Sequence, residues 1–343
     1  MSMKLADRFL DAANSAAICV IFPGALGDFI CFLPALRALA SRHRIVLYAR
    51  SEFAELVPAA VTVRSIERRE ISRLFVATPE LEVQVRQSFE AFAVVYSWMG
   101  HQQPTFAERL QAASGGRALI FPFRPAARAE HQADYYLRCL GVGEVSRGST
   151  VEVSRAADDW GERFWRDHLL CGRAVLMIAP GSGAREKNWP EAFFIEVADW
   201  WAEATEGIVL FLFGPVEAER GGFDRLREHG LGVSPLGLAQ TAALLQRSTV
   251  YLGNDSGISH LAAAVGTRTV ALFGPSDPVQ WAPRGRVSVI RRCMDCSPCS
   301  EPTMKSCPHR GCLTELSPAQ VIDVMRQVPE LASLTRGGAG ITV

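Results

Sequence analysis

The sequence predicts an α/β protein with two doubly wound, Rossmann-like domains, each built on a parallel sheet. Apolar strand-like segments alternate with helical stretches along the chain, as in parallel sheets that carry helices on both faces. Glycine-containing turns follow several of these strands. The chain has 343 residues, more than the roughly 250–300 at which a single core stops growing. We therefore expect two such domains, with their sheets facing each other across a cleft.

The first half contains four strand-like segments. They cover residues 16–22, 44–50, 92–98 and 117–123. A polar helix is expected before the first strand. After the turn PGALGD, an apolar helix is expected over Phe29–Ala40. Pro34 lies inside that helix and removes one backbone hydrogen bond, so a kink or a loosened turn is expected there.

The second half repeats this order. Apolar strands are expected at 174–183 and 207–214, and the helix between them begins at Glu191. A final amphipathic helix, LSPAQVIDVMRQVPEL, has proline in its first turn. We expect an N-terminal domain over residues 1–155 and a C-terminal domain over residues 170–325, joined within 141–172.

The stretch GNDSGISHLAAAVG predicts a helix that opens next to a strand end. Asp255 or Ser256 is the expected N-cap, and Gly266 stands where a helix ends in a left-handed residue. The apolar face comprises Leu261, Ala262, Ala264 and Val265. In a βαβ unit such a helix directs free N–H groups and a positive dipole end at the carboxyl edge of the sheet, where a phosphate binds. The alternative is a well-capped helix without a ligand.

The charge balance limits the partners. Basic and acidic residues number 36 each, so no overall field attracts nucleic acid or an anionic membrane. The N-terminus lacks the basic-then-apolar order of a signal peptide, and no apolar run approaches the ~20 residues needed to span a bilayer. A cytoplasmic protein with a local anion site is therefore expected.

The loop APGSGAREKNWP has the composition of a phosphate-binding loop. Gly181 and Gly183 allow a ligand to approach the backbone, Ser182 offers a hydroxyl and Lys187 a positive charge. The spacing matches neither the P-loop nor the dinucleotide fingerprint, which argues against a nucleoside triphosphatase and against a dehydrogenase. A flexible turn with a solvated lysine is the alternative.

Two other strand ends carry carboxylates. Glu217 and Glu219 follow the strand at 207–214, where an acid can bind a ribose diol; acids that merely begin a helix are the alternative. Asp28 stands at the start of the first-half helix. It serves there either as a helix cap or as a base that takes a proton from an attacking hydroxyl.

Three motifs together resemble the glycosyltransferase family 9 heptosyltransferases, which have the GT-B fold. They are PGALGDFICFLPALRAL, APGSGAREKNWPEAFF and GNDSGISHLAAAVGTRTVALFGPSDPVQWAPRG. The resemblance extends from about Ala16 to Met325. It implies transfer of a heptose from ADP-heptose to a growing lipopolysaccharide core, with inversion at the anomeric carbon and no metal. The chain has no Asp-x-Asp pair, which agrees with this.

The resemblance also implies roles for single residues. Asp28 is the expected general base. The residues expected to bind the nucleotide sugar are Ser182, Gly183, Lys187, Glu217 (or Glu219), Leu236, Asp255, Ser256, Gly257 and His260. Of these, Leu236 falls near the adenine and Glu217 near the ribose. His260 is either a phosphate ligand or a structural histidine.

Five cysteines cluster near the C-terminus. They are Cys293, Cys296, Cys299, Cys307 and Cys312. This density suits a structural zinc or iron site, although the four ligands are not singled out and the ferredoxin spacing is not met. Reduced, metal-free thiols are equally consistent with a reducing compartment. Catalysis requires no cofactor in either case.

The acceptor is expected to be a glycolipid or glycan, with at most a peripheral association of the protein with the inner face of the inner membrane. Basic residues available for an anionic acceptor in the first half are Arg37, Arg50, Arg124 and Arg128. The Trp98–His101 loop stacks on a sugar or belongs to the core. Two other functions stay open, namely a catalytically degenerate nucleotide-binding protein and a nucleotide-sugar epimerase.

Overall fold

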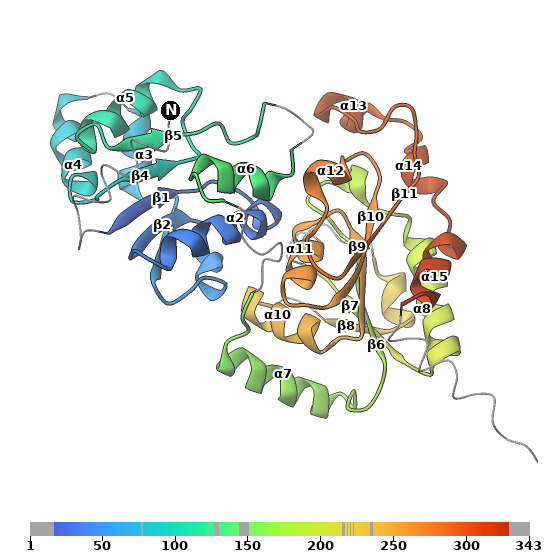
Figure 1. Cartoon of the computed structure of the whole chain (residues 1–343). Helices are drawn as coiled ribbons and strands as arrows, with labels where there is room; N and C mark the ends of the chain where they lie inside the picture. Colours follow the sequence, from blue (N-terminus) through green and yellow to red (C-terminus); the bar gives the residue numbers. More distant parts are fainter. Residues whose placement is uncertain are drawn as a thin grey trace, which may run out of the picture. The chain divides into compact units, whose positions relative to one another are not determined.

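The computed structural model describes residues 17–328, apart from 77, 127–129, 144–150, 215–216, 218, 220, 222 and 234–235. The expected N-terminal polar helix lies outside these residues. The chain divides into two compact units, Met1–Arg147 and Gly148–Val343. Each unit contains one parallel sheet with helices packed around it (Figure 1), so the predicted α/β class with two doubly wound sheets is confirmed.

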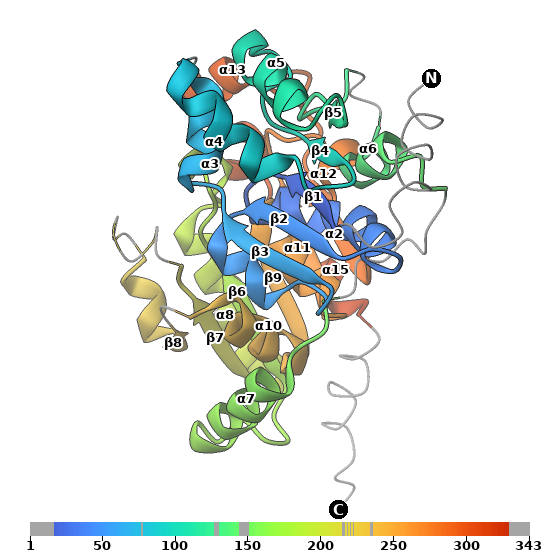
Figure 2. The same cartoon turned by 90° about the vertical axis from the view of Figure 1, so that its left-hand side faces the viewer.

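The first unit has a five-stranded parallel sheet in the order β3-β2-β1-β4-β5. Its strands are β1 (Ile18–Ile21), β2 (Ile45–Ala49), β3 (Val61–Ser65), β4 (Val95–Ser97) and β5 (Ala118–Ile120). Figure 2 shows β1, β2 and β3 side by side. Strand β3 was not predicted. It is an edge strand whose Thr62 and Arg64 side chains are exposed, so its sequence lacks an apolar run.

The helices of the first unit follow the predicted alternation. They are α2 (Leu26–Ala40), η1 (Ser51–Glu55), α3 (Arg69–Ser72), η2 (Arg73–Phe75), α4 (Pro79–Phe89), α5 (Pro104–Ala113) and α6 (Gln132–Cys139). Helix α2 contains Pro34 and begins three residues earlier than predicted, because Asp28 accepts a hydrogen bond from Ala25 N and so caps an earlier turn. Trp98 is 1% exposed and packs edge-on against Phe32; it belongs to the core, the second of its two predicted roles.

The second unit has a six-stranded parallel sheet in the order β11-β10-β9-β6-β7-β8. Its strands are β6 (Val175–Ala179), β7 (Ile208–Leu212), β8 (Leu231–Val233), β9 (Val250–Asn254), β10 (Arg268–Phe273) and β11 (Val287–Arg291). The predicted strands β6 and β7 are confirmed, and β9 and β10 flank α11 as a βαβ unit requires. The two that were not predicted, β8 and β11, are the two edges of the sheet.

The helices of the second unit surround this sheet. They are α7 (Arg155–Asp167), η3 (Arg185–Lys187), α8 (Glu191–Thr205), η4 (Arg225–Glu228), α10 (Leu238–Arg247), α11 (Gly257–Ala264), α12 (Pro278–Trp281), α13 (Glu301–Ser306), α14 (Gly311–Thr314) and α15 (Pro318–Arg326). Helix α8 begins at Glu191 as predicted, and α15 has Pro318 in its first turn. Helix α7 packs on α10, where Arg247 forms an ion pair with Asp158.

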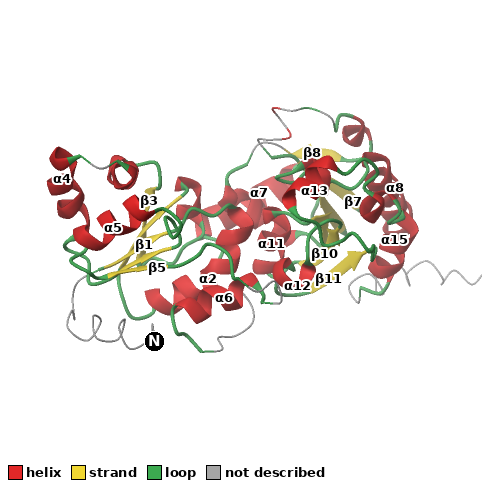
Figure 3. Cartoon of the chain, turned by 90° about the horizontal axis from the view of Figure 1, so that it is seen from above, coloured by secondary structure: helices red, strands yellow, loops and turns green. Residues whose placement is uncertain are grey.

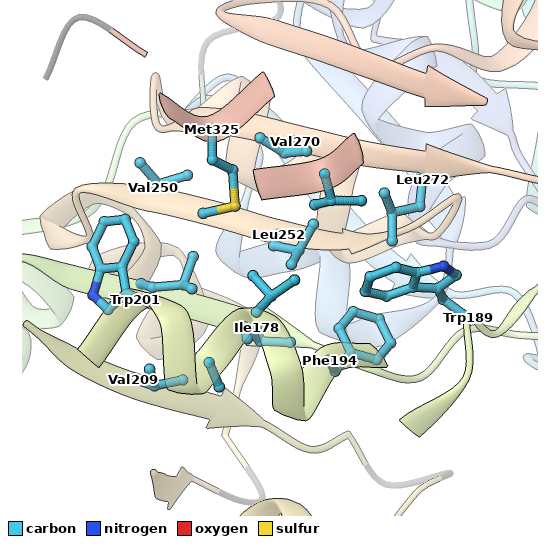
Figure 4. Close-up of a cluster of buried hydrophobic side chains, with 14 of the residues drawn as sticks. Ile178, Trp189, Phe194, Trp201, Val209, Val250, Leu252, Val270, Leu272 and Met325 are labelled. Atoms are coloured by element: carbon cyan, nitrogen blue, oxygen red, sulfur yellow. The ribbon is translucent and has the colours of Figure 1, made fainter. Parts of the chain in front are cut away.

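The core of the second unit lies between the central strands, α8 and α15. Seen from above, α8 and α15 run together at one side of the unit (Figure 3). Met325 of α15 is fully buried beside Val250 and Leu252 of β9 (Figure 4). The predicted amphipathic C-terminal helix is therefore part of this core. In the part of the chain that the structure describes, no helix is long and apolar enough to cross a membrane.

We expect Met325→Ala to destabilise the second unit by about 2–5 kcal/mol, because it leaves a cavity beneath α15. Gln327→Ala, at the exposed C-cap of the same helix, is the matched control and should stay within about 0.5 kcal/mol of the wild type. Urea unfolding followed by far-UV circular dichroism measures both. Equal losses for the two variants would show that α15 does not anchor the core.

Candidate functional site

Two loops meet at the carboxyl edge of the second sheet. Strands β6 and β9 are neighbours, with Ala179 in register with Gly253. Because parallel strands end at the same edge, the loop 180–189 after β6 lies beside the start of α11 after β9. This is the edge at which ligands bind in open parallel sheets.

Asn254, the last residue of β9, joins the two ends of the loop 180–189. Its side chain is fully buried. Nδ2 donates to the carbonyl of Pro180 at 2.7 Å, and Oδ1 accepts from the Trp189 N–H at 2.9 Å. One amide group thus satisfies two buried backbone groups and fixes where the loop leaves the sheet and where it returns.

Lys187 and Asp255 form an ion pair within this frame. Lys187 Nζ lies 2.7 Å from Asp255 Oδ2, and the two side chains are 28% and 9% exposed, respectively. Asp255 directly follows Asn254, so the same stretch of backbone fixes the loop and presents the partner of its lysine. The ammonium group is held in place but open to solvent on one side, which suits a contact with an anion.

The start of α11 is capped as predicted. Ser256 is the N-cap, and its Oγ accepts from the Ser259 N–H. Behind it, Ser259 Oγ donates to the Asn254 carbonyl and lies 3.1 Å from the Tyr251 hydroxyl. Burial raises the pKa of Tyr251 to about 12, so this hydroxyl stays protonated. The helix ends at Gly266, whose φ of 90° is left-handed, which confirms the predicted stop.

The hydroxyl group of Ser182 forms its hydrogen bonds within the loop 180–189 itself. Its Oγ lies 2.7 Å from both the Ala184 carbonyl and Asn188 Oδ1, so the hydroxyl shapes the loop. Gly183 is exposed, and a Cβ built there meets no atom within 4 Å. The open surface of the predicted phosphate loop is therefore the backbone around Gly183, beside Lys187.

Glu217 lies against the same loop, whereas Glu219 is exposed. Glu217 Oε2 accepts from the Gly214 N–H at 2.9 Å. A Cβ added at Gly181 would lie 1.9 Å from Glu217 Oε1, so Gly181 is required for the carboxylate to approach the loop. Of the two acids predicted for a ribose, the structure brings Glu217 to the site.

The remaining predicted residues of the second unit take different positions. Gly257 is the first residue of α11. His260 lies one turn further along and is 4% exposed, and it has an interaction partner within the protein, which matches a structural histidine better than an open ligand. Leu236 is half-buried next to Gly237, the N-cap of α10.

Asp28 lies in the first unit, at the carboxyl end of β1. Its Oδ2 accepts from the Ala25 N–H at 3.1 Å, and its Oδ1 pairs with Arg124 Nη1 at 2.5 Å. The side chain is 12% exposed. The N-cap is Ala25, so Asp28 supports the helix start from the third helical position instead of being the N-cap itself, and its role as a base stays a prediction.

The cysteine segment does not assemble a metal site. Of its five cysteines, Cys293 and Cys296 are exposed and Cys312 is buried. Among the described residues, no group of three or more His, Cys, Asp or Glu side chains is arranged to hold a metal ion. The zinc or iron site therefore stays a prediction, as does the metal-free alternative. Hydrogen bonds of other groups fix the segment.

These other groups attach the cysteine segment to the site edge. Ser297 Oγ donates to the Gly274 carbonyl and the Cys299 N–H to the Pro275 carbonyl, each at 2.8 Å. Arg310 Nη1 donates to the Arg185 carbonyl in the phosphate loop at 3.1 Å. The segment therefore supports the loops after β6 and β10.

Sequence reasoning missed the residues that hold the site together. Neither Asn254 nor Trp189 is among the predicted site residues. The Trp189 indole is 1% exposed and donates to the Leu316 carbonyl at 2.8 Å. A polar amide at the end of a buried parallel strand was the available signal, since such a group must find partners.

Known proteins share parts of this arrangement. Residues 144–308 match the model of glycosyltransferase family 9 (heptosyltransferase). Lipooligosaccharide heptosyltransferase 2 of Campylobacter jejuni is 29% identical over 166 residues, which are 45% of this chain and 51% of that protein. The chain thus spans about half the length of the curated relatives it matches.

Solved structures extend the likeness to the whole fold. A family 9 glycosyl transferase from Veillonella parvula has a TM-score of 0.74 at 22% identity, over 92% of this chain and 98% of that chain. The iron-containing heptosyltransferase TibC of enterotoxigenic E. coli, in complex with ADP-D-beta-D-heptose, has a TM-score of 0.61 at 16% identity, over 94% and 77% of the two chains. At these identities the likeness shows the fold.

The two parallel-sheet units, with a phosphate-type loop at the edge of the second sheet, have the GT-B fold. Residues 144–308, just under half of the chain, are similar to glycosyltransferase family 9.

We expect Asn254→Asp to destabilise the second unit by about 1–3 kcal/mol near pH 8, because a buried carboxylate faces the Pro180 carbonyl without a proton to donate. Burial raises the pKa of the new carboxyl group in the folded state. The loss in free energy of unfolding is therefore largest above this raised pKa. It shrinks as the pH falls through that pKa, because the protonated carboxyl group can donate a hydrogen bond again. Urea unfolding between pH 5 and pH 8 measures this change.

Asn188→Asp is the control in the same loop. Its oxygen only accepts, from Ser182, so the carboxylate keeps that bond and no pH-dependent deficit should appear. A deficit in Asn254→Asp that did not change with pH would contradict the role given to its Nδ2 group.

We also expect iodoacetamide at pH 8 to alkylate Cys293 and Cys296 well before Cys312. Cys312 is 7% exposed, and burial, together with neighbouring thiols, raises its pKa, so less of the reactive thiolate is present. Mass spectrometry of timed digests measures the order, and the urea-unfolded protein is the control. Equal protection of four cysteines, with zinc or iron released on their modification, would contradict a metal-free segment.

Proposed function

We propose that this protein is an inverting, metal-independent glycosyltransferase that moves a heptose from ADP-heptose to a lipopolysaccharide core or a related glycan acceptor. The observation that carries the proposal is the Lys187–Asp255 pair, held by Asn254 at the carboxyl edge of β6 and β9. The family match over the same residues supports heptose as the sugar.

The donor is assigned to the second unit. Lys187 supplies positive charge to the diphosphate, and the backbone around Gly183 lets it approach closely. The N-terminus of α11, with Ser256 and Gly257, adds free N–H groups and a positive dipole end. Glu217 is the group for the ribose and Leu236 for the adenine. These groups stabilise the negative charge that develops on the departing ADP.

The acceptor is assigned to the first unit, with Asp28 as general base. Asp28 takes the proton of the acceptor hydroxyl as its oxygen forms a bond to the anomeric carbon of the heptose. On the opposite side, the bond from that carbon to the phosphate oxygen breaks, and ADP leaves with the electron pair. Attack opposite the leaving group inverts the configuration. The lysine and the helix N-terminus supply the charge that a metal ion gives in other transferases.

The cellular location of the protein follows from these substrates. Nucleotide sugars are cytoplasmic, and a glycolipid acceptor would bring the protein to the inner face of the inner membrane as a peripheral protein. The degenerate binding protein and the epimerase are less well supported, because Asp28 and Lys187 are both present and the relatives named above are heptosyltransferases.

We expect ADP to be released from ADP-heptose only when an acceptor is present. Asp28→Asn should lower the rate by about 10²–10⁴-fold, because it removes the base, while ADP affinity stays within about threefold. Asn can still accept the Ala25 N–H bond, so the start of α2 is preserved. A coupled assay for ADP and calorimetric titration with ADP measure the two effects.

The control is Asp158→Asn, an acid at the α7–α10 contact away from the sheet edge. Conversion of the donor without any acceptor would support the epimerase. ADP binding without transfer to any acceptor would support the degenerate protein. A loss of ADP binding in Asp28→Asn would contradict the assignment of Asp28 to the acceptor.

A further inference from the structure

Arg124 forms an ion pair with one carboxylate oxygen of Asp28, the proposed base. The Asp28 carboxylate has two recorded partners: Oδ2 accepts from the Ala25 N–H, and Oδ1 lies 2.5 Å from Arg124 Nη1. Asp28 is 12% exposed and Arg124 44%. Helix α2 thus holds one oxygen of the carboxylate, and the guanidinium group of Arg124, whose side chain reaches solvent, holds the other.

The position of Arg124 is built by helix α6. Arg124 follows β5, and the two residues before it are anchored through their carbonyls. Tyr135 donates to the Pro122 carbonyl and Gln132 Nε2 to the Phe123 carbonyl. The guanidinium group also lies over the Phe123 ring, 4.4 Å from its centroid. Because α6 packs on α2, these contacts direct Arg124 to a residue 96 positions away in sequence.

This arrangement conflicts with general-base catalysis as it stands. A base must come within about 2.6–3.2 Å of the hydroxyl whose proton it takes. Oδ2 of Asp28 instead accepts from the Ala25 N–H at the start of α2, and Oδ1 is paired with a guanidinium group. To use that oxygen, an acceptor must draw Arg124 away. An anionic group can do this, because a guanidinium group binds phosphate or carboxylate through two parallel hydrogen bonds.

Among the arginines considered for the acceptor, the structure distinguishes Arg124. Arg50 is exposed at the end of β2, and Arg37 lies in the last turn of α2; neither has a recorded contact with Asp28. Arg128 lies outside the described residues. Arg124 is the described arginine that pairs with the proposed base.

We propose that Arg124 is a positioning and specificity residue that exchanges Asp28 for an anionic group of the acceptor, a phosphate or a carboxylate, and so uncovers the base only when such an acceptor binds. This inference rests on the proposed function. An acceptor without the anion leaves the carboxylate covered, and the Arg124–Asp28 pair therefore selects for charged acceptors.

The exchange is tested by binding, which does not depend on turnover. Glucose 6-phosphate and glucuronate serve as probes for the two anions, with glucose as the uncharged control. Calorimetric titrations are made with saturating ADP present, so that the phosphate loop of the second unit is occupied. Asp28→Asn removes the competing carboxylate and should bind at least one anionic probe about five- to tenfold more tightly than the wild type.

Arg124→Ala should bind that probe at least about tenfold more weakly than the wild type, and Arg124→Lys should recover part of the loss. Arg138→Ala is the matched control and should leave binding unchanged, because Arg138 of α6 pairs with Glu130, which precedes that helix. The probe that binds more tightly shows whether the acceptor anion is a phosphate or a carboxylate. If Asp28→Asn binds neither probe more tightly, or if Arg124→Ala binds both as the wild type does, the exchange is wrong.

Transfer assays give an independent measurement. Arg124→Ala should lose at least about tenfold in kcat/KM with an acceptor that carries the anion, and should match or exceed the wild type with the same acceptor after the anion is removed, because the substitution uncovers Asp28. Equal losses with both acceptors would reduce Arg124 to a structural role. Failure of ADP binding or of transfer in the wild type would instead contradict the proposed function, and the probe titrations would still decide the exchange.

Discussion

The two hydrogen bonds of the Asn254 side chain are the constraint on which the second unit's site depends. An asparagine at the end of a buried strand must pair both ends of its amide, and here the partners are the two ends of the loop 180–189. Because Asp255 comes next in the chain, the same constraint places the partner of Lys187. The position of the loop 180–189 and the placement of the Lys187–Asp255 ion pair therefore both follow from Asn254.

Other contacts strengthen the same edge. Gly181 leaves room for the Glu217 carboxylate, and the Trp189 indole connects the loop to the carbonyl before α15. The cysteine segment adds Arg310, which donates to the loop at Arg185. These side chains support the loop backbone, so the groups left for a ligand are few: the Lys187 ammonium, the backbone near Gly183 and the start of α11. The first unit applies the same principle to Asp28, whose position is fixed by Ala25 and Arg124.

The sequence predicted the central strands and the helices between them, because buried parallel strands are continuous apolar runs. It missed β3, β8 and β11, which are all sheet edges. Strands β3 and β11 carry polar residues, and β8 has only three residues. Lys187 and Asp255 were each singled out from the sequence, but their pairing was not, since 68 residues separate them and only the order of strands brings β6 beside β9. The Arg124–Asp28 pair was missed for the same reason. The metal site suggested by the cysteine spacing stays a prediction, because spacing alone does not single out ligands.

The most direct test of the central claim, that the edge of β6 and β9 is a site for ADP, is calorimetric titration of the whole protein with ADP, UDP and GDP, repeated on Lys187→Ala. The account predicts selective binding of ADP, weakened about tenfold or more by the substitution, since a hydrogen bond to a charged group contributes about 1.5–3 kcal/mol. Binding of ADP that the substitution leaves unchanged would contradict the account, and so would a preference for UDP or GDP.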